Sequence, residues 1–415
     1  MKNTGIGLYL SNASNKKYIL EQIIENIFLH KYINLSLLQG ALHSSLTINR
    51  LIDDEIRHDK YVVQTDENTS LSSMSSGQQK KALLTYLISQ QPQYMILDDV
   101  YSNIDKNTQQ FITTTLNQLA KTTNLIQLFF RRQDLLSCID TVLMIDENNI
   151  IINELSAEVF QNQKTYHIKL PIRFKLPKVY IDNQIDIDLL IKLNNVSVHY
   201  GDKKVLNNIN WIIRTGEFWQ LVGPNGSGKS TLMTIITGDN PRGYGQDMIL
   251  FGKKKGSGES IWDIKKQIGY FTPSMIEQFK HVDSVENMII SGLVDSVGLY
   301  TKPTDIQKDI AKSWIEMLGS GYINKTFQQL SLGQQRMVMV VRAMVKHPPL
   351  LILDEPTIEL DDENSQLFIM MINAIAREKK IAILYISHRD ESNLEPDKIF
   401  ELIPSPIGSE GIIRS

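Results

Sequence analysis

A glycine-rich run in the second half of the sequence has the residue types that bind a phosphate group. It follows the apolar run 218–222, which predicts a buried β-strand, and it fits the pattern G-x-x-x-x-G-K-[S/T]. Glycines let backbone N–H groups converge on an anion at the start of the next helix. The Lys229 ammonium adds a positive charge, and the Ser230 hydroxyl is a ligand for Mg²⁺. The residues expected to contact nucleotide phosphates are Gly223, Pro224, Asn225, Gly226, Ser227, Gly228, Lys229, Ser230 and Thr231.

Polar residues after two later apolar runs have the chemistry of phosphoryl transfer. The run 350–353 predicts a buried strand that ends at Asp354, whose carboxylate can hold Mg²⁺. Glu355 can polarise the attacking water as a general base or by orienting it. His388 follows the predicted strand 381–386 and can contact the γ-phosphate. Taken singly these residues could also lie in a surface turn; their order behind the phosphate loop favours the catalytic interpretation.

A second anion-binding turn is expected at residues 331–334. Ser331 precedes an apolar run with helical spacing that extends to Val345, and N–H groups at the start of a helix attract negative charge. Leu332 preserves the helix start. The residues of this turn expected to contact nucleotide are Ser331, Gly333 and Gln334.

The order and spacing of these motifs resemble those of the ATP-binding cassette (ABC) ATPases. The resemblance implies an α/β P-loop NTPase fold with a mostly parallel core sheet and a helical subdomain, with ATP and Mg²⁺ as ligands and ATP hydrolysis as the activity. It also implies that Tyr200 stacks on adenine, although an aromatic residue packed at a strand end is the alternative. In this family, the turn equivalent to residues 331–334 closes over the nucleotide that is bound to a facing cassette.

The first half of the chain repeats the pattern in a degenerate form. Three motifs keep a constant offset of 256 residues, which indicates an internal duplication: Ser75 with Ser331, Asp98 with Asp354, and Asp105 with Asp361. The first signature-like turn consists of Ser75, Ser76, Gly77 and Gln78. The same offset places Arg132 opposite His388, so the first half has no switch histidine.

The counterpart of the phosphate loop is residues 10–17, at an offset of 213. Leu10, Ala13 and Asn15 replace glycines, and Lys17 cannot bind Mg²⁺, so that Lys16 is the one reactive residue retained. About 43 residues are missing between this loop and the signature turn, mostly from the helical subdomain, and the antiparallel strands before the loop are absent. We expect the first site to be hydrolytically inactive.

Two arrangements of the working site stay open. Either the loop 223–231 closes on Ser75, Ser76, Gly77 and Gln78 of the same chain, or two second halves form a homodimer that uses Ser331. The expected domains are a degenerate, truncated cassette at 1–165, a short linker at 166–190 and an intact cassette at 191–415.

Composition supports a globular protein. The chain has 415 residues, 42% apolar and 21% charged, with a net charge of −3. A single cysteine excludes a disulfide within the chain and a cysteine zinc or iron–sulfur cluster. No apolar run approaches the roughly 20 residues that span a bilayer, and the first residues are not a secretion signal. We therefore expect a cytoplasmic protein, which could lie at the inner face of the cell membrane.

The second half resembles a narrower group, the tandem-cassette ATPases without membrane spans known as molybdate-transport or photorepair ATP-binding proteins. The resemblance rests on residues 237–241 and 252–266. The basic residues Lys253 to Lys255 are interpreted as a solvated loop. The glutamine that the family places after 268–270 is absent from 271–274, so a nearby hydroxyl group replaces it or coupling to a partner is altered.

Three functions remain open at this stage. The preferred one is the ATP-binding subunit of a transporter, working with a separately encoded membrane permease. The alternatives are a soluble ABC ATPase acting on ribosomes or nucleic acid, and a protein-binding ATP switch. A short linker and the degenerate first loop argue against the ribosome-acting tandem cassettes.

Overall fold

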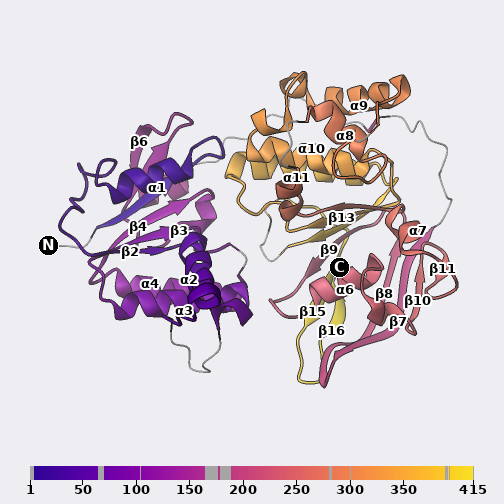
Figure 1. The fold of residues 1–415 in the computed structure, drawn as a ribbon, viewed down its shortest axis with the longest axis horizontal. Coiled ribbons are helices and arrows are strands. Elements are labelled where there is room, and N and C mark those ends of the chain that lie inside the picture. The colour runs from indigo at the N-terminus through magenta and orange to yellow at the C-terminus, as the bar shows by residue number, and fades with distance from the viewer. Residues whose placement is uncertain are drawn as a thin grey trace. The chain divides into compact units, whose positions relative to one another are not determined.

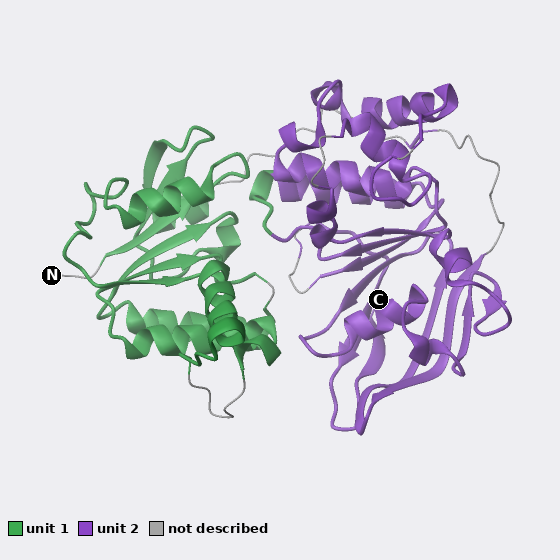
Figure 2. Cartoon of the chain, viewed as in Figure 1, with its two compact units in different colours: residues 1–167, 359–363 green, residues 168–358, 364–415 purple. Residues whose placement is uncertain are grey.

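The computed structural model describes the whole chain except residues 1–3, 64–69, 103, 164–175, 178–187, 280–282, 300, 388–390, 392 and 415. The chain divides into two compact units (Figure 2): unit 1 contains residues 1–167 and 359–363, and unit 2 contains residues 168–358 and 364–415. The predicted linker lies mostly outside the described residues.

Unit 1 is built on a single six-stranded sheet with the strand order β2-β3-β4-β1-β5-β6 (Figure 1). Neighbouring strands are parallel except for β6, which is antiparallel to β5. The strands are β1 (Gly5–Tyr9), β2 (Gly40–His43), β3 (Tyr94–Asp98), β4 (Asn124–Phe129), β5 (Thr141–Ile145) and β6 (Ile151–Ser156).

Helices cover both faces of this sheet because its central strands are apolar on both sides. Along β3, Met95 and Leu97 pack on one face with the buried residues of α3 and α4, whereas Ile96 packs on the other with α1. The helices are α1 (Lys16–Ile24), α2 (Ser45–His58), α3 (Ser76–Ser89), α4 (Lys106–Leu119) and α5 (Ala157–Asn162). The result is a three-layer α/β unit with two cores.

Unit 2 contains two sheets. The larger has the order β12-β13-β14-β9-β15-β16, with only β16 antiparallel, and the smaller is the antiparallel sheet β11-β10-β7-β8. The strands are β7 (Leu189–Tyr200), β8 (Lys203–Arg214), β9 (Phe218–Val222), β10 (Asp247–Leu250), β11 (Lys253–Lys254), β12 (Ile268–Phe271), β13 (Leu350–Asp354), β14 (Ala382–Ile386), β15 (Lys398–Ile403) and β16 (Glu410–Arg414). The predicted strands at 218–222, 350–353 and 381–386 are thus confirmed as β9, β13 and β14.

The two sheets of unit 2 share one hydrophobic core. Trp211 on β8 is buried and stacks on Phe400 of β15, with ring centroids 4.2 Å apart. The helices are α6 (Lys229–Ile236), α7 (Ile261–Lys265), α8 (Val285–Ser291), α9 (Asp305–Leu318), α10 (Leu332–Met344) and α11 (Asp362–Arg377). None of the helices in the described ranges has the length and apolar character that a membrane crossing requires.

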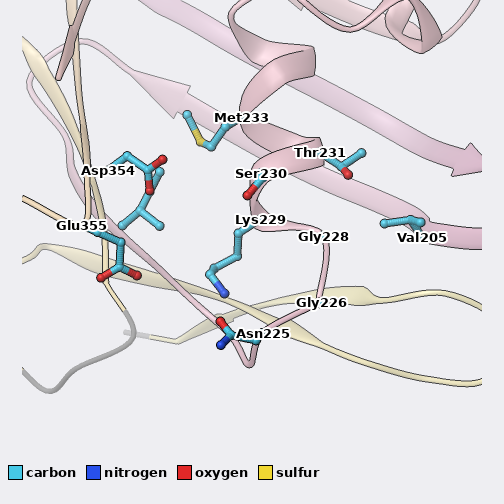
Figure 3. A pocket seen from close by; sticks show the side chains of 11 residues that line it. Val205, Asn225, Gly226, Gly228, Lys229, Ser230, Thr231, Met233, Asp354 and Glu355 are labelled. Carbon is cyan, nitrogen blue, oxygen red and sulfur yellow. The ribbon is translucent and has the colours of Figure 1, made fainter. Parts of the chain in front are cut away.

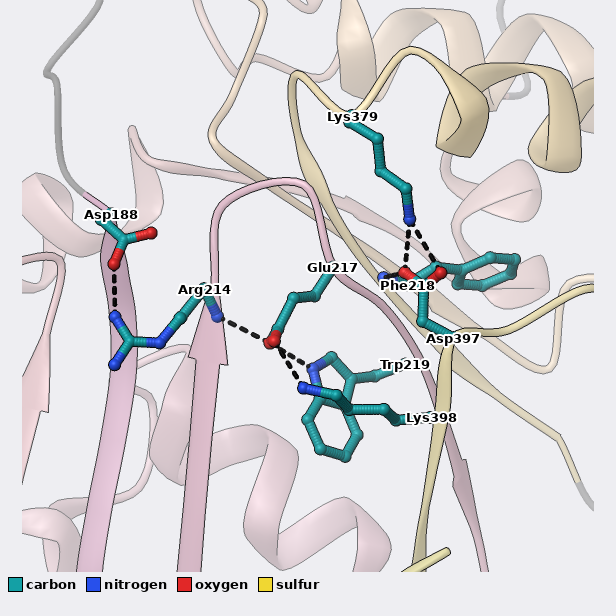
Figure 4. Close-up of polar contacts among 8 residues, drawn as sticks. All are labelled: Asp188, Arg214, Glu217, Phe218, Trp219, Lys379, Asp397 and Lys398. Atoms are coloured by element: carbon teal, nitrogen blue, oxygen red, sulfur yellow. Dashed lines mark hydrogen bonds and ion pairs between the residues drawn. The ribbon is translucent and has the colours of Figure 1, made fainter. Parts of the chain in front are cut away.

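A polar network fixes the start of β9, the strand that leads into the glycine-rich loop (Figure 4). The Phe218 N–H donates to Oδ2 of Asp397 at 2.8 Å, and that carboxylate also accepts from Lys379. Glu217, the residue before Phe218, accepts hydrogen bonds from the Trp219 indole N–H at 2.8 Å and from the Lys398 ammonium at 2.7 Å. Both carboxylates tie β9 to β15, so the loop begins from a fixed position.

Strand by strand, the large sheets of the two units have the same order. In unit 1 the strand before the loop, β1, lies between β4 and β5, and in unit 2 its counterpart β9 lies between β14 and β15. In each sheet an antiparallel strand, β6 or β16, forms the edge next to β5 or β15. Unit 1, in the part that the structure describes, has no equivalent of the antiparallel sheet. Its segments between α1 and β2 and between β2 and α3 are both shorter than their counterparts, so the deletion is not confined to the helical subdomain. Two tandem cassettes, the first truncated, were predicted, and the fold agrees.

The basic run at 253–255 differs from the prediction. Lys253 and Lys254 are exposed on β11, but Lys255 is only 5% exposed. Its ammonium lies 3.2 Å from Oε1 of Glu259 and 4.5 Å from the centre of the Tyr244 ring. A buried ammonium needs such a partner, so Lys255 holds the loop in place rather than facing solvent.

Candidate nucleotide-binding site

The glycine-rich loop joins β9 to α6 and takes a conformation that needs glycine. Gly226 and Gly228 have φ of +77° and +92°, a region that other residues seldom occupy. A Cβ on Gly228 would also lie 2.7 Å from Cδ2 of Leu206 on β8. The loop therefore turns sharply into α6, and the N–H groups of the first helical turn are left at its mouth.

A cavity of about 370 Å³ opens in front of this loop (Figure 3). In Figure 3 the side chains of Asp354 and Glu355, at the end of β13, lie across the cavity from Lys229 and Asn225. Predicted site residues that line the cavity are Asn225, Gly226, Gly228, Lys229, Ser230, Thr231, Asp354 and Glu355. Residues separated by more than 100 positions in the sequence thus meet at one edge of the sheet, where the carboxyl ends of parallel strands lie.

The loop carries hydrogen-bond donors suited to an anion. Nζ of Lys229 donates to the carbonyl oxygens of Gly223 at 2.7 Å and Pro224 at 3.0 Å. Oγ of Ser227 is fully buried and makes no hydrogen bond within the described residues. A buried hydroxyl group without a partner costs on the order of 1–3 kcal/mol. The loop therefore has donor capacity that its own residues do not use.

Two oxygen donors in the cavity suit Mg²⁺. The Ser230 hydroxyl and the Asp354 carboxylate line the same cavity, and Mg²⁺ prefers hard oxygen ligands, with water and phosphate completing its shell. Burial raises the pKa of Asp354, while a hydrogen bond from Tyr270 and the charge of Lys229 lower it. Tyr270 and Lys229 therefore both favour the ionised form of the Asp354 carboxylate, which is the form that binds a metal.

Glu355 has a strained backbone. Its φ is +51°, and its N–H donates to the carbonyl oxygen of Ile386 on β14 at 2.9 Å. The equivalent residue of unit 1, Asp99, has φ of +48°. A non-glycine residue in this region costs on the order of 1 kcal/mol. Both halves retain the conformation, and only the second has a glutamate there.

The signature turns keep the same structure in both units. Ser331 caps α10 and forms a reciprocal capping box with Gln334; Ser75 caps α3 and forms the same box with Gln78. This satisfies N–H groups at the helix start and fixes its direction. Ser76 and Gly77, like Leu332 and Gly333, form the first turn of their helix.

Two buried cationic side chains, Arg336 and Lys80, were not identified as site residues from the sequence. Arg336, on α10, donates to the carbonyl oxygen of Pro356 at 2.6 Å. Lys80, on α3, donates to the carbonyl oxygens of Asp99 and Ser102, each at 2.8 Å. Each cation links a signature helix to the loop that follows the metal strand. Arg336 and Lys80 are 256 positions apart, the same offset as the other repeated motifs, so the internal duplication could have shown that they are equivalent.

The degenerate loop of unit 1 does not have the geometry of a phosphate loop. No residue from 10 to 17 has a positive φ, so its N–H groups do not form the same concave nest. Nζ of Lys16 lies 3.1 Å from Oδ1 of Asp98, which it neutralises. Burial raises the pKa of Asp98, and Lys16 opposes that shift. The two retained reactive groups of the first half are paired with each other.

Unit 1 also includes the segment 359–363, and this segment engages the degenerate loop. The Asn12 N–H donates to Oδ2 of Asp361 at 2.7 Å, and the Asp361 N–H donates back to Oδ1 of Asn12 at 2.8 Å. A backbone N–H of the loop is therefore bonded to a carboxylate of the chain itself.

Among the described residues predicted to bind nucleotide in the second half, Gly223, Pro224, Ser227 and Tyr200 are not in the lining of this cavity. Tyr200 ends β7, and its hydroxyl accepts a hydrogen bond from Nδ2 of Asn240 at 2.8 Å. His388 lies outside the described residues.

Comparison with known proteins supplies the family. The ABC transporter family model matches residues 206–358. The chain is 34% identical over 379 residues to the ABC transporter ATP-binding protein ModF of Escherichia coli K12, covering 85% of this chain and 76% of ModF. The chain belongs to the ABC ATPases. It is also 35% identical over 205 residues to the zinc uptake system ATP-binding protein ZurA of Listeria innocua, covering 48% of this chain and 76% of ZurA.

Among solved structures, the RNase-L Inhibitor is similar over 99% of this chain and 85% of its own length, with a TM-score of 0.61 and 12% identity. At that identity the likeness concerns the fold alone. It agrees with two cassettes in tandem, as the sequence predicted.

Proposed function

We propose that the second cassette binds ATP and hydrolyses it with Mg²⁺. The observation that carries the proposal is the single cavity lined by Lys229, Ser230, Asp354 and Glu355. A phosphate loop, a carboxylate suited to Mg²⁺ and a second carboxylate next to it are the groups that nucleotide hydrolysis needs.

Each side chain has a defined task. Lys229 turns from the loop carbonyls to the phosphates and neutralises their charge, while the loop N–H groups hold the β-phosphate. Ser230 and Asp354 would hold Mg²⁺, which would stabilise the negative charge that develops on the phosphate oxygens. Glu355 orients water for in-line attack on the γ-phosphorus and accepts its proton, so that ADP and inorganic phosphate leave. His388 is proposed to contact the γ-phosphate.

The first cassette is proposed to be catalytically inactive. Its loop has no positive φ, and Lys16 is paired with Asp98. The duplication supplies a matched test: Lys229→Ala should abolish high-affinity ATP binding, whereas Lys16→Ala should keep the affinity within about two-fold. Retained binding in Lys229→Ala would refute the site, and loss in Lys16→Ala would refute the assignment of an inactive first loop.

We further propose that the competent site is composite, formed by the loop of the second cassette and the signature turn of the first. The Ser75 turn keeps its capping box, whereas the loop 10–17 of the same unit has lost its glycines and has no positive φ. The signature turn of unit 1 has therefore changed less than its phosphate loop. A turn that serves another loop would be retained in this way. The rival arrangement is a homodimer of second cassettes.

The partner is proposed to be a separately encoded membrane permease. A second cavity of about 420 Å³, lined by Trp262, Met275, Phe279 and Tyr270, adjoins the metal site, because Tyr270 also bonds Asp354. Trp262 is 65% exposed there, as expected of an aromatic residue that contacts a partner. Both relatives described above carry transport names, which supports the proposal.

A pull-down of tagged Glu355→Gln protein with ATP, from its own cells, tests the partner. Glutamine cannot accept the proton, so ATP stays bound and the closed state is long-lived. Recovery of integral membrane proteins supports a transport motor. Recovery of ribosomes or nucleic acid would instead establish a soluble remodelling factor.

A further inference from the structure

Tyr200 belongs to the β7–β8 hairpin, whose residue Val205 lines the nucleotide cavity. Tyr200 ends β7, and Gly201, with φ of +58°, turns the chain into β8, where Val205 lines the cavity. The Tyr200 side chain is 43% exposed. Part of the aromatic surface is therefore open to a ligand.

Asn240 fixes the outer end of this ring. Its Nδ2 donates to the Tyr200 hydroxyl at 2.8 Å, and Asn240 itself is only 8% exposed. The Asn240 N–H donates to the carbonyl oxygen of Thr234 at 2.9 Å. Thr234 lies on α6 about one turn beyond Thr231, which lines the cavity. The ring is thereby anchored to the helix that carries the phosphate loop.

Arg242 covers the ring. The centre of its guanidinium lies 4.4 Å from the ring centroid, within the range of a cation–π contact. The Arg242 N–H donates to Oδ1 of Asn240 at 3.1 Å, at the start of the short helix Pro241–Gly243. Within the described residues no carboxylate is paired with Arg242. The guanidinium therefore has an aromatic face as its partner instead of an acid.

We propose that Arg242 and Asn240 are positioning residues for the adenine base of the nucleotide. Arg242 occupies one face of the Tyr200 ring, Asn240 holds its hydroxyl, and the base stacks on the remaining face. The inference rests on the proposed function, since the base of a bound nucleotide is what uses that face. A ring held in one rotamer loses no further side-chain entropy when the base arrives, which favours binding.

The test compares ATP with inorganic tripolyphosphate, which has the phosphates but no base. Equilibrium binding of each, with Mg²⁺, is measured on the full chain. We expect Arg242→Ala to weaken ATP binding about five-fold and to change tripolyphosphate binding less than about two-fold. Arg242 is exposed, so this variant is expected to fold. Arg377→Ala, another exposed arginine, which pairs with Glu395, is the control and should change neither affinity.

A double variant separates positioning from a general charge effect. If Arg242 acts through the ring, adding Arg242→Ala to Tyr200→Ala should cause no further loss of ATP affinity. An unchanged ATP affinity in Arg242→Ala, an equal loss for both ligands, or additive losses in the double variant would each overturn the inference. Wild-type protein that binds neither ligand would overturn the proposed function itself.

Discussion

The hydroxyl of Tyr270 donates a hydrogen bond to Oδ2 of Asp354, at 3.3 Å. Tyr270 lies on β12, which pairs with the strand that carries Asp354. The family glutamine is missing from the segment that follows, and the Tyr270 hydroxyl contacts the proposed metal carboxylate. Tyr270 also lines the cavity that contains Trp262. One side chain therefore touches both the metal site and the proposed partner surface.

Replacing Tyr270 with phenylalanine should weaken the response to Mg²⁺. The bond lowers the pKa of Asp354, so its loss raises that pKa and leaves more of the carboxyl group protonated. A bond to a charged group contributes about 1 kcal/mol or more, so half-saturating Mg²⁺ should rise about five-fold. The effect should be larger at pH 6 than at pH 8. Magnesium titrations of ATPase activity measure it, with Tyr244→Phe as the control; equal responses to Mg²⁺ would contradict the role of Tyr270.

Glu355→Gln and Asp99→Asn form a matched pair at the strained position of the two halves. Glu355→Gln should reduce turnover about 100-fold or more, because the water loses its base, while bound ATP persists. Asp99→Asn should leave turnover within about two-fold. Single-turnover hydrolysis with radiolabelled ATP measures both. A strong effect of Asp99→Asn would show that the first half contributes to chemistry.

Ser75→Arg and Ser331→Arg distinguish the two arrangements of the working site. Each removes the same helix cap, at a cost of about 1 kcal/mol, and each places a long side chain on a signature turn. With an intrachain composite site, Ser75→Arg should abolish steady-state ATPase activity and Ser331→Arg should preserve it. The reverse pattern would establish the homodimer, and thermal melting checks that both variants fold.

The buried His43 predicts a loss of stability in mild acid. Burial lowers its pKa to about 4, and its Nε2 donates to the carbonyl oxygen of Lys80 at 3.1 Å. Below pH 6.5 the unfolded chain binds a proton that the folded unit does not, so stability falls by about 3 kcal/mol between pH 6.5 and 4.

The measurement is the melting temperature between pH 7 and pH 5. His43→Gln should flatten the decrease, whereas His58→Gln, at an exposed histidine of α2, should not. A decrease that is the same in wild type and His43→Gln would mean that other groups carry the acid sensitivity.

The sequence alone determined the cassette fold, the duplication and the residues around the loop 223–231. These follow from local rules: glycines mark the positive φ positions, apolar runs mark buried strands, and a constant offset preserves motif order. Because carboxyl ends of parallel strands meet at one edge, even the proximity of Lys229 and Asp354 could be predicted.

Tertiary structure decided which polar side chains are partners. Tyr270 with Asp354, Arg242 with Tyr200 and Lys255 with Glu259 depend on how strands and loops pack, and single-residue patterns do not specify such pairs. The backbone of residues 10–17 is a further case: the sequence shows that glycines are replaced there, and the structure shows that no residue of this loop has a positive φ. A chain that has lost the ligand-binding conformation can rearrange locally, and only the folded structure shows how it does so.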